Sequence, residues 1–275
     1  MGYVIGIDIG GTTTKIVGIK NGDLLKPVTP FKVQATDPVT SAYGAFGRFI
    51  SENSIPLGEI ERVMFTGAGA SRLHGGFFNL LTEKVNEFQA LGLGGLALSD
   101  CDEAIIVSMG TGTAFVRATG DGVQHIGGTG VGGGTLLGLS DRMFNIRNFD
   151  NIVETAENGN LEQVDLQIKD ITSDRVSTLD PETTASNFGK LSDVATNADI
   201  ALGIINLVFQ TIGMFAVFAI RNDTIKRVVL TGNLTLIPQA KGIFDTLEKL
   251  YDVSFLIPDN AEYATAFGAA LAFFK

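Results

Sequence analysis

The sequence predicts an α/β protein built from two related lobes that face a cleft. Its 275 residues with 45% hydrophobic content are enough to bury two cores of ordinary size. Short apolar runs of strand type alternate with helical patterns. A strand, glycine turn, strand unit occurs twice, as IGIDIGGTTTKIVGI and as AIIVSMGTGTAFVRA. We therefore expect a first lobe over residues 1–99 and a second lobe over residues 100–275.

Strand and helix signals follow the same order in both halves. In the first half we expect strands at 3–8, 15–19, 30–34 and 62–65 and helices at 39–50 and 87–98. In the second half we expect strands at 104–107 and 113–117, a glycine-rich turn, helices, a long helix at 195–221, strands at 227–230 and 253–257, and a last helix. The glycine turn in each half joins two strands, which favours a hairpin over a strand-helix unit.

Composition limits the class of partner. The 20 basic and 30 acidic residues give a net charge of −10, which disfavours nucleic acid or an anionic membrane as a partner. The longest apolar stretch, residues 204–220, contains Asn206, Gln210 and Thr211 and predicts a buried helix or a dimer interface. The N-terminal residues begin a strand without a signal-peptide pattern, so we expect a cytoplasmic protein. The single cysteine, Cys101, excludes a disulfide framework or a cysteine-rich metal site within one chain.

Asp8 is the first candidate for a functional site. It lies in an apolar strand directly before a Gly-Gly-Thr turn, where an unpaired charge is costly. Glycine permits a phosphate to approach the backbone closely, and threonine adds a hydroxyl donor. Two such hairpins can clamp one triphosphate, with Mg²⁺ between Asp8 and the phosphates. A turn or capping aspartate is the alternative for Asp8. The hairpin candidates are Gly10, Gly11, Thr12 and Thr13, and Gly110, Thr111, Gly112 and Thr113.

The sequence also contains glycine patterns of other phosphate sites. The P-loop pattern is absent from the sequence, and Gly128, Gly130 and Gly133 spell G-x-G-x-x-G in a place that a Rossmann site does not occupy. A glycine turn that opens a helix provides an anion site through the free N–H groups of the first helical turn. The candidates for such a site are Gly130, Gly132, Gly133 and Gly134, followed by Thr135.

Several segments together resemble one family. DIGGTTTK, MGTGTAF and TGN are similar to the phosphate and adenosine motifs of the actin, sugar kinase and heat-shock chaperone ATPase superfamily. Within it, TGAGA, VNEFQALGLGG, HIGGTGVGGGTLLGL, TASNFG and NAEYATAFGAAL resemble, in order, segments of the type II pantothenate kinases. The resemblance spans nearly the whole chain. It implies a two-lobed actin-like ATPase fold with duplicated ribonuclease H-like domains.

The resemblance also implies an activity and roles for single residues. The activity is transfer of the ATP γ-phosphate, with Mg²⁺, to the 4′-hydroxyl of pantothenate, the first step toward coenzyme A. Glu87 matches the general base of the family, against the alternative of a glutamate that favours a helix start. Lys15 matches the hairpin lysine that reaches a phosphate. The residues matching the adenosine region are Thr231, Gly232 and Asn233. A homodimer is implied, and a coenzyme A thioester is a candidate inhibitor.

The sequence departs from the family pattern at His125. An arginine that faces the transferred phosphoryl group commonly stands there in the family, and a histidine is charged only part of the time near neutrality. A surface histidine in a turn is the alternative interpretation.

Two other functions stay open. One is a kinase for pantetheine or another small hydroxyl substrate such as a sugar. The single cysteine argues against the zinc motif of repressor-related sugar kinases and the iron-sulfur cluster of dehydratase-activating ATPases. A non-catalytic sensor of ATP or an acyl-coenzyme A is the second. The departure at His125 favours the sensor, whereas Asp8, Glu87 and both glycine hairpins favour the enzyme.

Overall fold

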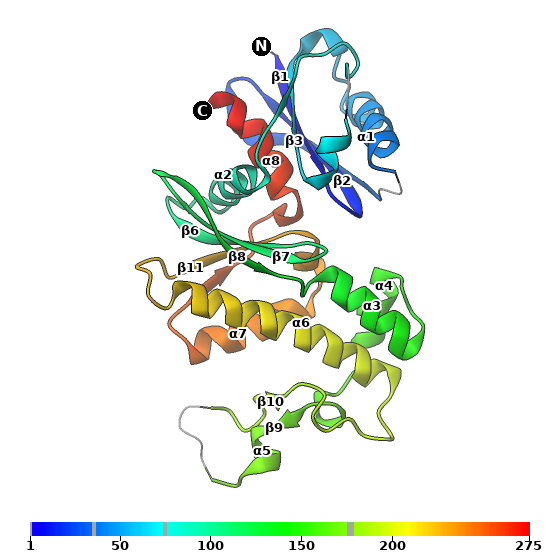
Figure 1. Cartoon of the computed structure of the whole chain (residues 1–275), viewed down its shortest axis with the longest axis vertical. Helices are drawn as coiled ribbons and strands as arrows, with labels where there is room; N and C mark the ends of the chain where they lie inside the picture. The colour runs from blue at the N-terminus through cyan, green and yellow to red at the C-terminus, as the bar shows by residue number, and fades with distance from the viewer. Residues whose placement is uncertain (1, 35–36, 74–75, 175–178) are drawn as a thin grey trace.

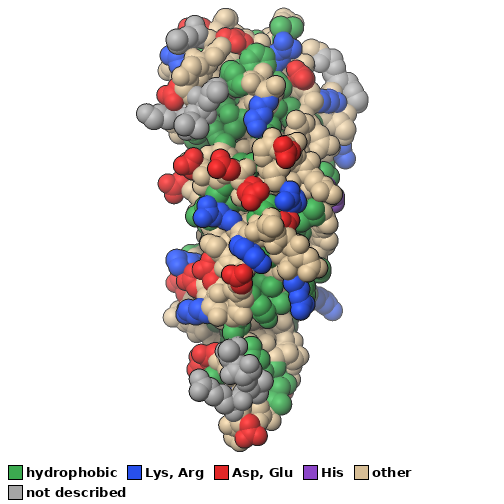
Figure 2. All heavy atoms as spheres, turned by 90° about the vertical axis from the view of Figure 1, so that its left-hand side faces the viewer, with side chains coloured by type: hydrophobic (Ala, Val, Ile, Leu, Met, Phe, Trp, Pro, Cys, Tyr) green, Lys and Arg blue, Asp and Glu red, His purple; other side chains and the backbone are tan. Residues whose placement is uncertain are grey.

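The computed structural model describes residues 2–34, 37–73, 76–174 and 179–275, with the backbone alone for residues 24–26. Two five-stranded sheets, each with helices on both faces, lie one above the other along the long axis of the molecule (Figure 1). A small segment that contains α5 extends from the end distant from the N-terminus. On the face seen in Figure 2, acidic and basic side chains are interspersed along the molecule.

The first sheet has the strand order β3-β2-β1-β4-β5. Its strands are β1 (Tyr3–Ile9), β2 (Thr13–Lys20), β3 (Asp23–Gln34), β4 (Ile60–Thr66) and β5 (Thr82–Lys84). The first three form an antiparallel meander, and β4 and β5 run parallel to β1. Helix α1 (Pro38–Glu52) begins at the N-cap Asp37, whose side chain accepts from the Thr40 N–H, and buries Phe46 and Phe49 against this sheet.

The second sheet repeats this arrangement in the order β12-β11-β6-β7-β8. Its strands are β6 (Ala104–Met109), β7 (Thr113–Thr119), β8 (Gly122–Thr129), β11 (Arg227–Thr231) and β12 (Ser254–Leu256). Its helices on one face are α3 (Gly133–Phe144), α4 (Phe149–Ala156), α6 (Asn197–Ile220) and α7 (Gln239–Leu250). The equal strand orders confirm the duplication that the two glycine hairpins predicted.

One predicted element is wrong. The residues after 117 were expected to form a glycine-rich turn, but residues 122–129 form strand β8, which pairs with β7 and carries His125 opposite Val116. The ladder shifts register between Phe115 and Val116, and this irregularity accommodates the glycines within a strand. His125 is therefore a strand residue at a sheet edge.

Two helices lie between the sheets, and each packs on the sheet formed by the other half of the chain. Helix α2 (Glu87–Ser99) packs on the second sheet, where Leu91 joins the cluster of Ile106 and Val116. Helix α8 (Ala264–Leu271), near the end of the chain, packs on the first sheet and joins the cluster of Val4 and Met64. These contacts cross the boundary that the sequence predicted between residues 99 and 100.

The two helices cross with their backbones in contact. A Cβ added to Gly94 would lie 1.8 Å from the Ala264 carbonyl oxygen, and one added to Gly268 would lie 1.8 Å from the Ala90 carbonyl oxygen. Atoms at that distance would overlap, so both positions require glycine.

Helix α6 is the long apolar helix that the sequence predicted. It begins at Thr196, whose hydroxyl accepts from the Asp199 N–H while the Asp199 carboxylate accepts from the Thr196 N–H. It is long and apolar enough to cross a membrane, but 61% of its most apolar window is buried inside the protein. This burial identifies it as a core helix of the second lobe.

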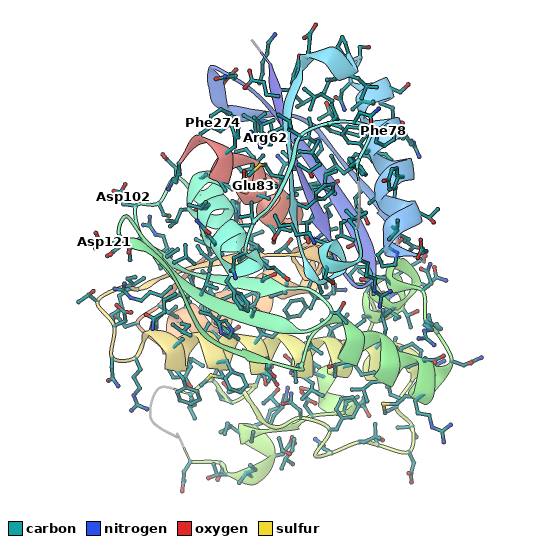
Figure 3. All side chains as sticks on the ribbon, turned by 45° about the horizontal axis from the view of Figure 1, so that its top comes forward. Arg62, Phe78, Glu83, Asp102, Asp121 and Phe274 are labelled. Carbon is teal, nitrogen blue, oxygen red and sulfur yellow. The ribbon has the colours of Figure 1, made fainter. Side chains whose placement is uncertain are left out.

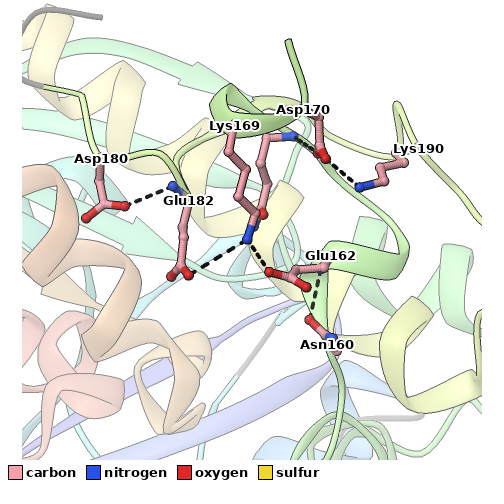
Figure 4. Close-up of polar contacts among 8 residues, drawn as sticks. Asn160, Glu162, Lys169, Asp170, Asp180, Glu182 and Lys190 are labelled. Atoms are coloured by element: carbon pink, nitrogen blue, oxygen red, sulfur yellow. Dashed lines mark hydrogen bonds and ion pairs between the residues drawn. The ribbon is translucent and has the colours of Figure 1, made fainter. Parts of the chain in front are cut away.

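The segment between α4 and α6 forms a small substructure of β9 (Leu166–Gln167), α5 (Ile168–Ile171) and β10 (Thr184–Ser186). Ion pairs link residues on the surface of this substructure (Figure 4). Lys169 contacts Glu162 and Glu182, and Lys190 contacts Asp170 at 2.6 Å. Fully buried Asp165 ties it to α6 by accepting from Asn206 Nδ2 at 2.7 Å. Because the surface pairs are worth at most about 1 kcal/mol each, the buried tie is the stronger anchor.

The helix crossing gives a test of the fold. Gly268→Ala is expected to lower the free energy of unfolding by about 3 kcal/mol or more, because the added methyl group overlaps a backbone oxygen. Gly44→Ala in α1 is the matched control, since a Cβ there meets nothing within 4 Å, and it should stabilise by about 0.5–1 kcal/mol. Urea unfolding of both variants measures the difference. Equal stabilities would contradict the backbone contact.

Candidate active site at the junction of the lobes

Asp8 lies at the C-terminal end of β1, in the middle of the first sheet. Its ladder neighbours are Lys15 on β2 and Thr66 on β4, and its side chain is only 9% exposed. Burial raises the pKa of Asp8, and the positive charge of Lys15 lowers it in part. Burial likewise lowers the pKa of Lys15, which the negative charge of Asp8 opposes. Lys15, its cross-strand neighbour, is thus a cationic side chain whose charge acts on Asp8, and the Mg²⁺ expected at Asp8 stays a prediction.

Gly67 fixes the position of the Asp8 carboxylate. It follows β4 with φ +86°, and a Cβ there would lie 2.5 Å from Asp8 Oδ1. Gly232 follows β11 with φ +92°, and a Cβ there would lie 2.5 Å from the Met109 carbonyl oxygen. Both glycines stand after a buried threonine, Thr66 or Thr231, and before a short 3₁₀ helix. In each lobe, a tight turn of the same kind therefore lies against the end of the central strand, β1 in the first sheet and β6 in the second.

The first glycine hairpin presents its turn to solvent. The Gly10 N–H donates to the Thr13 carbonyl at 2.9 Å, and Gly11 and Thr12 are exposed. This open turn is the part of the predicted phosphate site that can accept an anion without rearrangement of the chain.

The second hairpin is closed by the glycines that follow β8. The Gly133 N–H donates to the Gly110 carbonyl at 2.8 Å, and the Gly134 N–H donates to the Thr111 carbonyl at 2.9 Å. The Gly132 N–H donates to Thr135 Oγ1 at 3.3 Å. These three N–H groups are engaged within the protein, and the anion site expected at the start of α3 stays a prediction.

A further hydrogen bond in the same region holds this segment to β7. The Thr113 hydroxyl donates to the Val131 carbonyl at 2.8 Å. The part of Gly110, Thr111, Gly112, Thr113 and the Gly130–Gly134 segment in nucleotide binding thus stays a prediction. It rests on the close approach that glycine permits rather than on free donors.

One side-chain contact bridges the two lobes at the hairpins. Asn233 Nδ2 donates to Thr13 Oγ1 at 3.4 Å, while buried Asn233 Oδ1 has no hydrogen-bond partner among the described residues. Thr231 has a different role, because its hydroxyl donates to the Val107 carbonyl at 3.0 Å and ties β11 to β6. Of the TGN motif, Asn233 is therefore the residue that meets the first hairpin.

Glu87 is the first residue of α2. Asn86 caps this helix by accepting from the N–H groups of Phe88 at 3.0 Å and Gln89 at 3.2 Å. Solvent reaches the Glu87 side chain, but the surrounding protein removes part of its water and raises its pKa, and the negative charge of Asp8 raises the pKa further. The structure thus places the two predicted carboxylates, which are far apart in sequence, near enough for the charge of Asp8 to raise the pKa of Glu87.

His125 contacts Phe88, the residue that follows Glu87 in the chain. The imidazole ring stacks on the Phe88 ring with centroids 4.1 Å apart and planes inclined by 14°. The same rings border a cavity of about 480 Å³ between α2 and the β7–β8 hairpin. Figure 3 marks the tip of this hairpin by Asp121.

Sequence reasoning missed two residues of this region. Gly67 belongs to the TGAGA motif but was not connected with Asp8, although the repetition of Thr-Gly after β4 and β11 was a readable signal. Phe88 follows Glu87, and nothing in the sequence shows that it stacks on a residue 37 positions later.

Comparisons with known proteins show the family of this chain. Residues 97–252, more than half of the chain, match the Fumble family. The chain belongs to the Fumble family. A type II pantothenate kinase of Staphylococcus saprophyticus is 27% identical over 238 residues, which cover 83% of this chain and 84% of that protein. One of Bacillus thuringiensis is 28% identical over 246 residues, which cover 85% and 83%.

Solved structures show the fold of this Fumble-family chain. Component A of the (R)-2-hydroxyglutaryl-CoA dehydratase of Acidaminococcus fermentans superposes with a TM-score of 0.69 at 17% identity, covering 99% of this chain and 97% of that one. A ROK family glucokinase of Streptomyces griseus, solved with glucose and AMPPNP, superposes with a TM-score of 0.62 at 12% identity, covering 98% and 99%. The fold is that of the actin-like ATPases, as predicted.

The Asp8–Lys15 pair of the Fumble-family chain can be tested by a double-mutant cycle. Asp8→Asn and Lys15→Met each remove one charge of a buried pair and leave the other without its opposite neighbour. The double variant should recover part of the loss, with a favourable coupling of about 0.5–3 kcal/mol in the free energy of unfolding at pH 7. Urea unfolding of the four proteins measures it. Additive effects would contradict the electrostatic contact.

Proposed function

We propose that this chain is an ATP-dependent kinase that phosphorylates the 4′-hydroxyl of pantothenate, the first step toward coenzyme A. The observation that carries the proposal is that Asp8 ends the central strand of the first lobe and Glu87 begins α2, near enough for partial burial and then the charge of Asp8 to raise the pKa of Glu87, in a two-lobed ATPase fold. Membership of the Fumble family supports the reaction class, and the names of its relatives support pantothenate as the acceptor.

Glu87 serves as the general base in this proposal. A carboxylate with a raised pKa is a stronger base than an ordinary glutamate, and it accepts the proton of the acceptor hydroxyl as that oxygen attacks phosphorus. The Asn86 cap fixes the start of α2, so the carboxylate is held by a rigid element.

Asp8 fits a magnesium site that nucleotide phosphates complete. Mg²⁺ takes oxygen ligands, keeps several waters and needs one or two carboxylates beside phosphates. The parts of the chain that the structure describes contain no cluster of three or more His, Cys, Asp or Glu side chains, so an all-protein cage is absent there. Bound Mg²⁺ would neutralise phosphate charge. Asp8, pressed against Gly67, would hold it directly or through water.

Two basic side chains complete the proposed site. Lys15 is directed toward the phosphates from β2, and His125 faces the transferred phosphoryl group from β8. Negative charge spreads over three phosphoryl oxygens in the transition state, so a fixed cation there stabilises it. The Phe88 ring holds the imidazole by stacking, which limits its movement.

The test is ADP release by the purified protein with Mg·ATP and a panel of pantothenate, pantetheine, glucose and N-acetylglucosamine. Release that depends on pantothenate supports the proposal. Release with another acceptor alone would redirect it to that substrate. Binding of ATP without release for any acceptor would favour the sensor.

The general base sets an expectation for pH. Glu87→Gln should lower kcat by about 10²–10⁴ with little change in the KM for ATP. Because the pKa of Glu87 is raised above its ordinary value of 4.5, wild-type activity should fall on acidification at a pH above 4.5, as the base takes up a proton. Glu83→Gln on the exposed strand β5 is the matched control and should keep the wild-type rate and profile. Near-normal turnover of Glu87→Gln would contradict the assignment.

His125 gives a second test. Arginine keeps its charge at alkaline pH, whereas a histidine side chain loses its proton in the physiological range. His125→Arg should therefore raise kcat several-fold at pH 8 and less at pH 6. Gln124→Arg adds the same charge to the opposite face of β8 and should have no such effect. A common pH profile for wild type, His125→Arg and His125→Ala would leave the phosphoryl charge to Lys15.

We also propose that the chain forms a homodimer through α6. The helix carries a stripe of apolar side chains on its outer side, where Phe215 is 47% and Phe218 is 58% exposed and Leu207 and Met214 are half-buried. Such a stripe on a helix already buried along its other faces suits a second copy of the same helix.

Phe218→Glu should convert the dimer into a monomer, because it places a charge in an apolar interface. Light scattering at micromolar concentration measures the mass. Leu57→Glu, at a residue of the first lobe that is 43% exposed, is the control and should leave the dimer intact. A monomeric wild-type protein would refute the proposal.

A further inference from the structure

A buried hydroxyl group, that of Thr66, lies next to the candidate site. Thr66 is the last residue of β4 and is 1% exposed, and its Oγ1 atom has no hydrogen-bond partner among the residues that the structure describes. Burial of a polar group without a partner costs free energy, so most buried hydroxyls in proteins are hydrogen-bonded. The Thr66 hydroxyl therefore requires an explanation, and a partner that it meets only in the ligand-bound protein supplies one.

The second lobe contains an equivalent hydroxyl that does have a partner. Thr231 ends β11 as Thr66 ends β4, each is 1% exposed, and each precedes a glycine with positive φ. The Thr231 hydroxyl donates to the Val107 carbonyl at 3.0 Å. The ladder registers make Ile7 the counterpart of Val107 in the first lobe. The fold thus offers Thr66 a backbone acceptor of the same kind, but its hydroxyl makes no such bond.

Asp8 distinguishes the first lobe from the second at this point. It is in register with Thr66, whereas Ser108 is in register with Thr231. Residues in register on neighbouring strands point to the same face of a sheet, so the Thr66 hydroxyl and the Asp8 carboxylate are neighbours. The residue after Thr66 is Gly67, where a Cβ would lie 2.5 Å from Asp8 Oδ1. Rotation about χ1 of Thr66 redirects its hydroxyl, and a carboxylate is a stronger acceptor than a carbonyl.

We infer that Thr66 is a positioning residue for Asp8, and that its hydroxyl donates to the Asp8 carboxylate in the protein with bound Mg·nucleotide. The inference rests on the ATP-binding part of the proposed function and does not depend on the acceptor. Carboxylates that hold metal ions are themselves oriented by hydrogen bonds from neighbouring groups. Lys15 acts on Asp8 from β2 through its charge, and Thr66 adds a directed hydrogen bond from β4.

Removal of the hydroxyl tests the inference through nucleotide binding instead of turnover. Thr66→Val keeps the branched side chain and removes the donor, whereas Thr66→Ser keeps the donor. Calorimetry measures AMPPNP binding with Mg²⁺ and with EDTA in its place. Thr66→Val should weaken binding of Mg·AMPPNP about tenfold or more and leave binding without Mg²⁺ unchanged. Thr66→Ser should bind Mg·AMPPNP as wild type does, and so should Thr82→Val, the matched control on exposed strand β5.

Urea unfolding of the nucleotide-free protein gives a second readout, which separates the two equivalent threonines. Thr66→Val replaces an unpartnered hydroxyl by a methyl group and should raise the urea concentration at the midpoint. Thr231→Val removes the hydrogen bond to the Val107 carbonyl and should lower that concentration. If Thr66 had only a structural role, both variants would unfold at lower urea concentration than wild type.

The outcomes separate this inference from the function on which it rests. Equal binding of Mg·AMPPNP by Thr66→Val and wild type would overturn the positioning role. Equal weakening with and without Mg²⁺ would do the same, because such an effect does not depend on the metal at Asp8. A lowered unfolding midpoint for Thr66→Val would contradict a hydroxyl reserved for the bound form.

The kinase proposal is judged by different measurements. A wild type that binds Mg·AMPPNP but releases no ADP with any acceptor would end the kinase proposal alone, since the binding comparison still decides the role of Thr66. A wild type that binds no nucleotide would overturn both the proposed function and the positioning role.

Discussion

The backbone contact between α2 and α8 is the constraint on which the rest of the structure depends. Gly94 meets Ala264 and Gly268 meets Ala90, so the contact is reciprocal. Ala90 and Gly94 are spaced along the chain as Ala264 and Gly268 are, and Asn86 and Asn260 stand at equivalent positions before these alanines. Because each helix is packed on a different sheet, this one crossing sets the distance between the sheets. It thereby sets how far Asp8 of the first sheet stands from Glu87 and from the glycine hairpin of the second lobe.

The two lobes share one strand order but carry different side chains at equivalent positions. In the first sheet Asp8 of β1 is in register with Thr66 of β4, and in the second sheet Ser108 of β6 is in register with Thr231 of β11. Asp8 therefore corresponds to Ser108, and the carboxylate of the first lobe is replaced by a hydroxyl in the second. Glu87, the residue after Asn86, corresponds to Ala261, the residue after Asn260. Both acids of the candidate site thus belong to one half, and the other half offers a polyphosphate no opposing carboxylate at the equivalent positions. A symmetric fold supports an asymmetric reaction through these two differences.

Much of this could be predicted from the sequence, and the errors have physical causes. The hairpins, the long helix and the two-lobed frame follow from glycine placement and apolar periodicity, which are local signals. Strand β8 was missed because Gly127 and Gly128 indicate a turn, whereas cross-strand pairing with β7 overrides that preference. The hydrogen bonds from the Gly133 and Gly134 N–H groups to the Gly110 and Thr111 carbonyls were not predicted, because they join segments that only the tertiary fold brings together. The choice of α8 as partner of the first sheet depends on contacts between chain ends, which no local pattern encodes.

The place of α8 has a consequence for how the protein is made. One face of the first sheet, with Val4, Val17 and Met64, is covered by residues 266–270. A chain that emerges from the ribosome from its N-terminus exposes that apolar face until residues 266–270 have been synthesised. The first lobe therefore cannot complete its fold before α8 has left the ribosome, although all of its strands are made much earlier. A truncation before residue 264 would leave this apolar face of the sheet exposed to water and prone to aggregation.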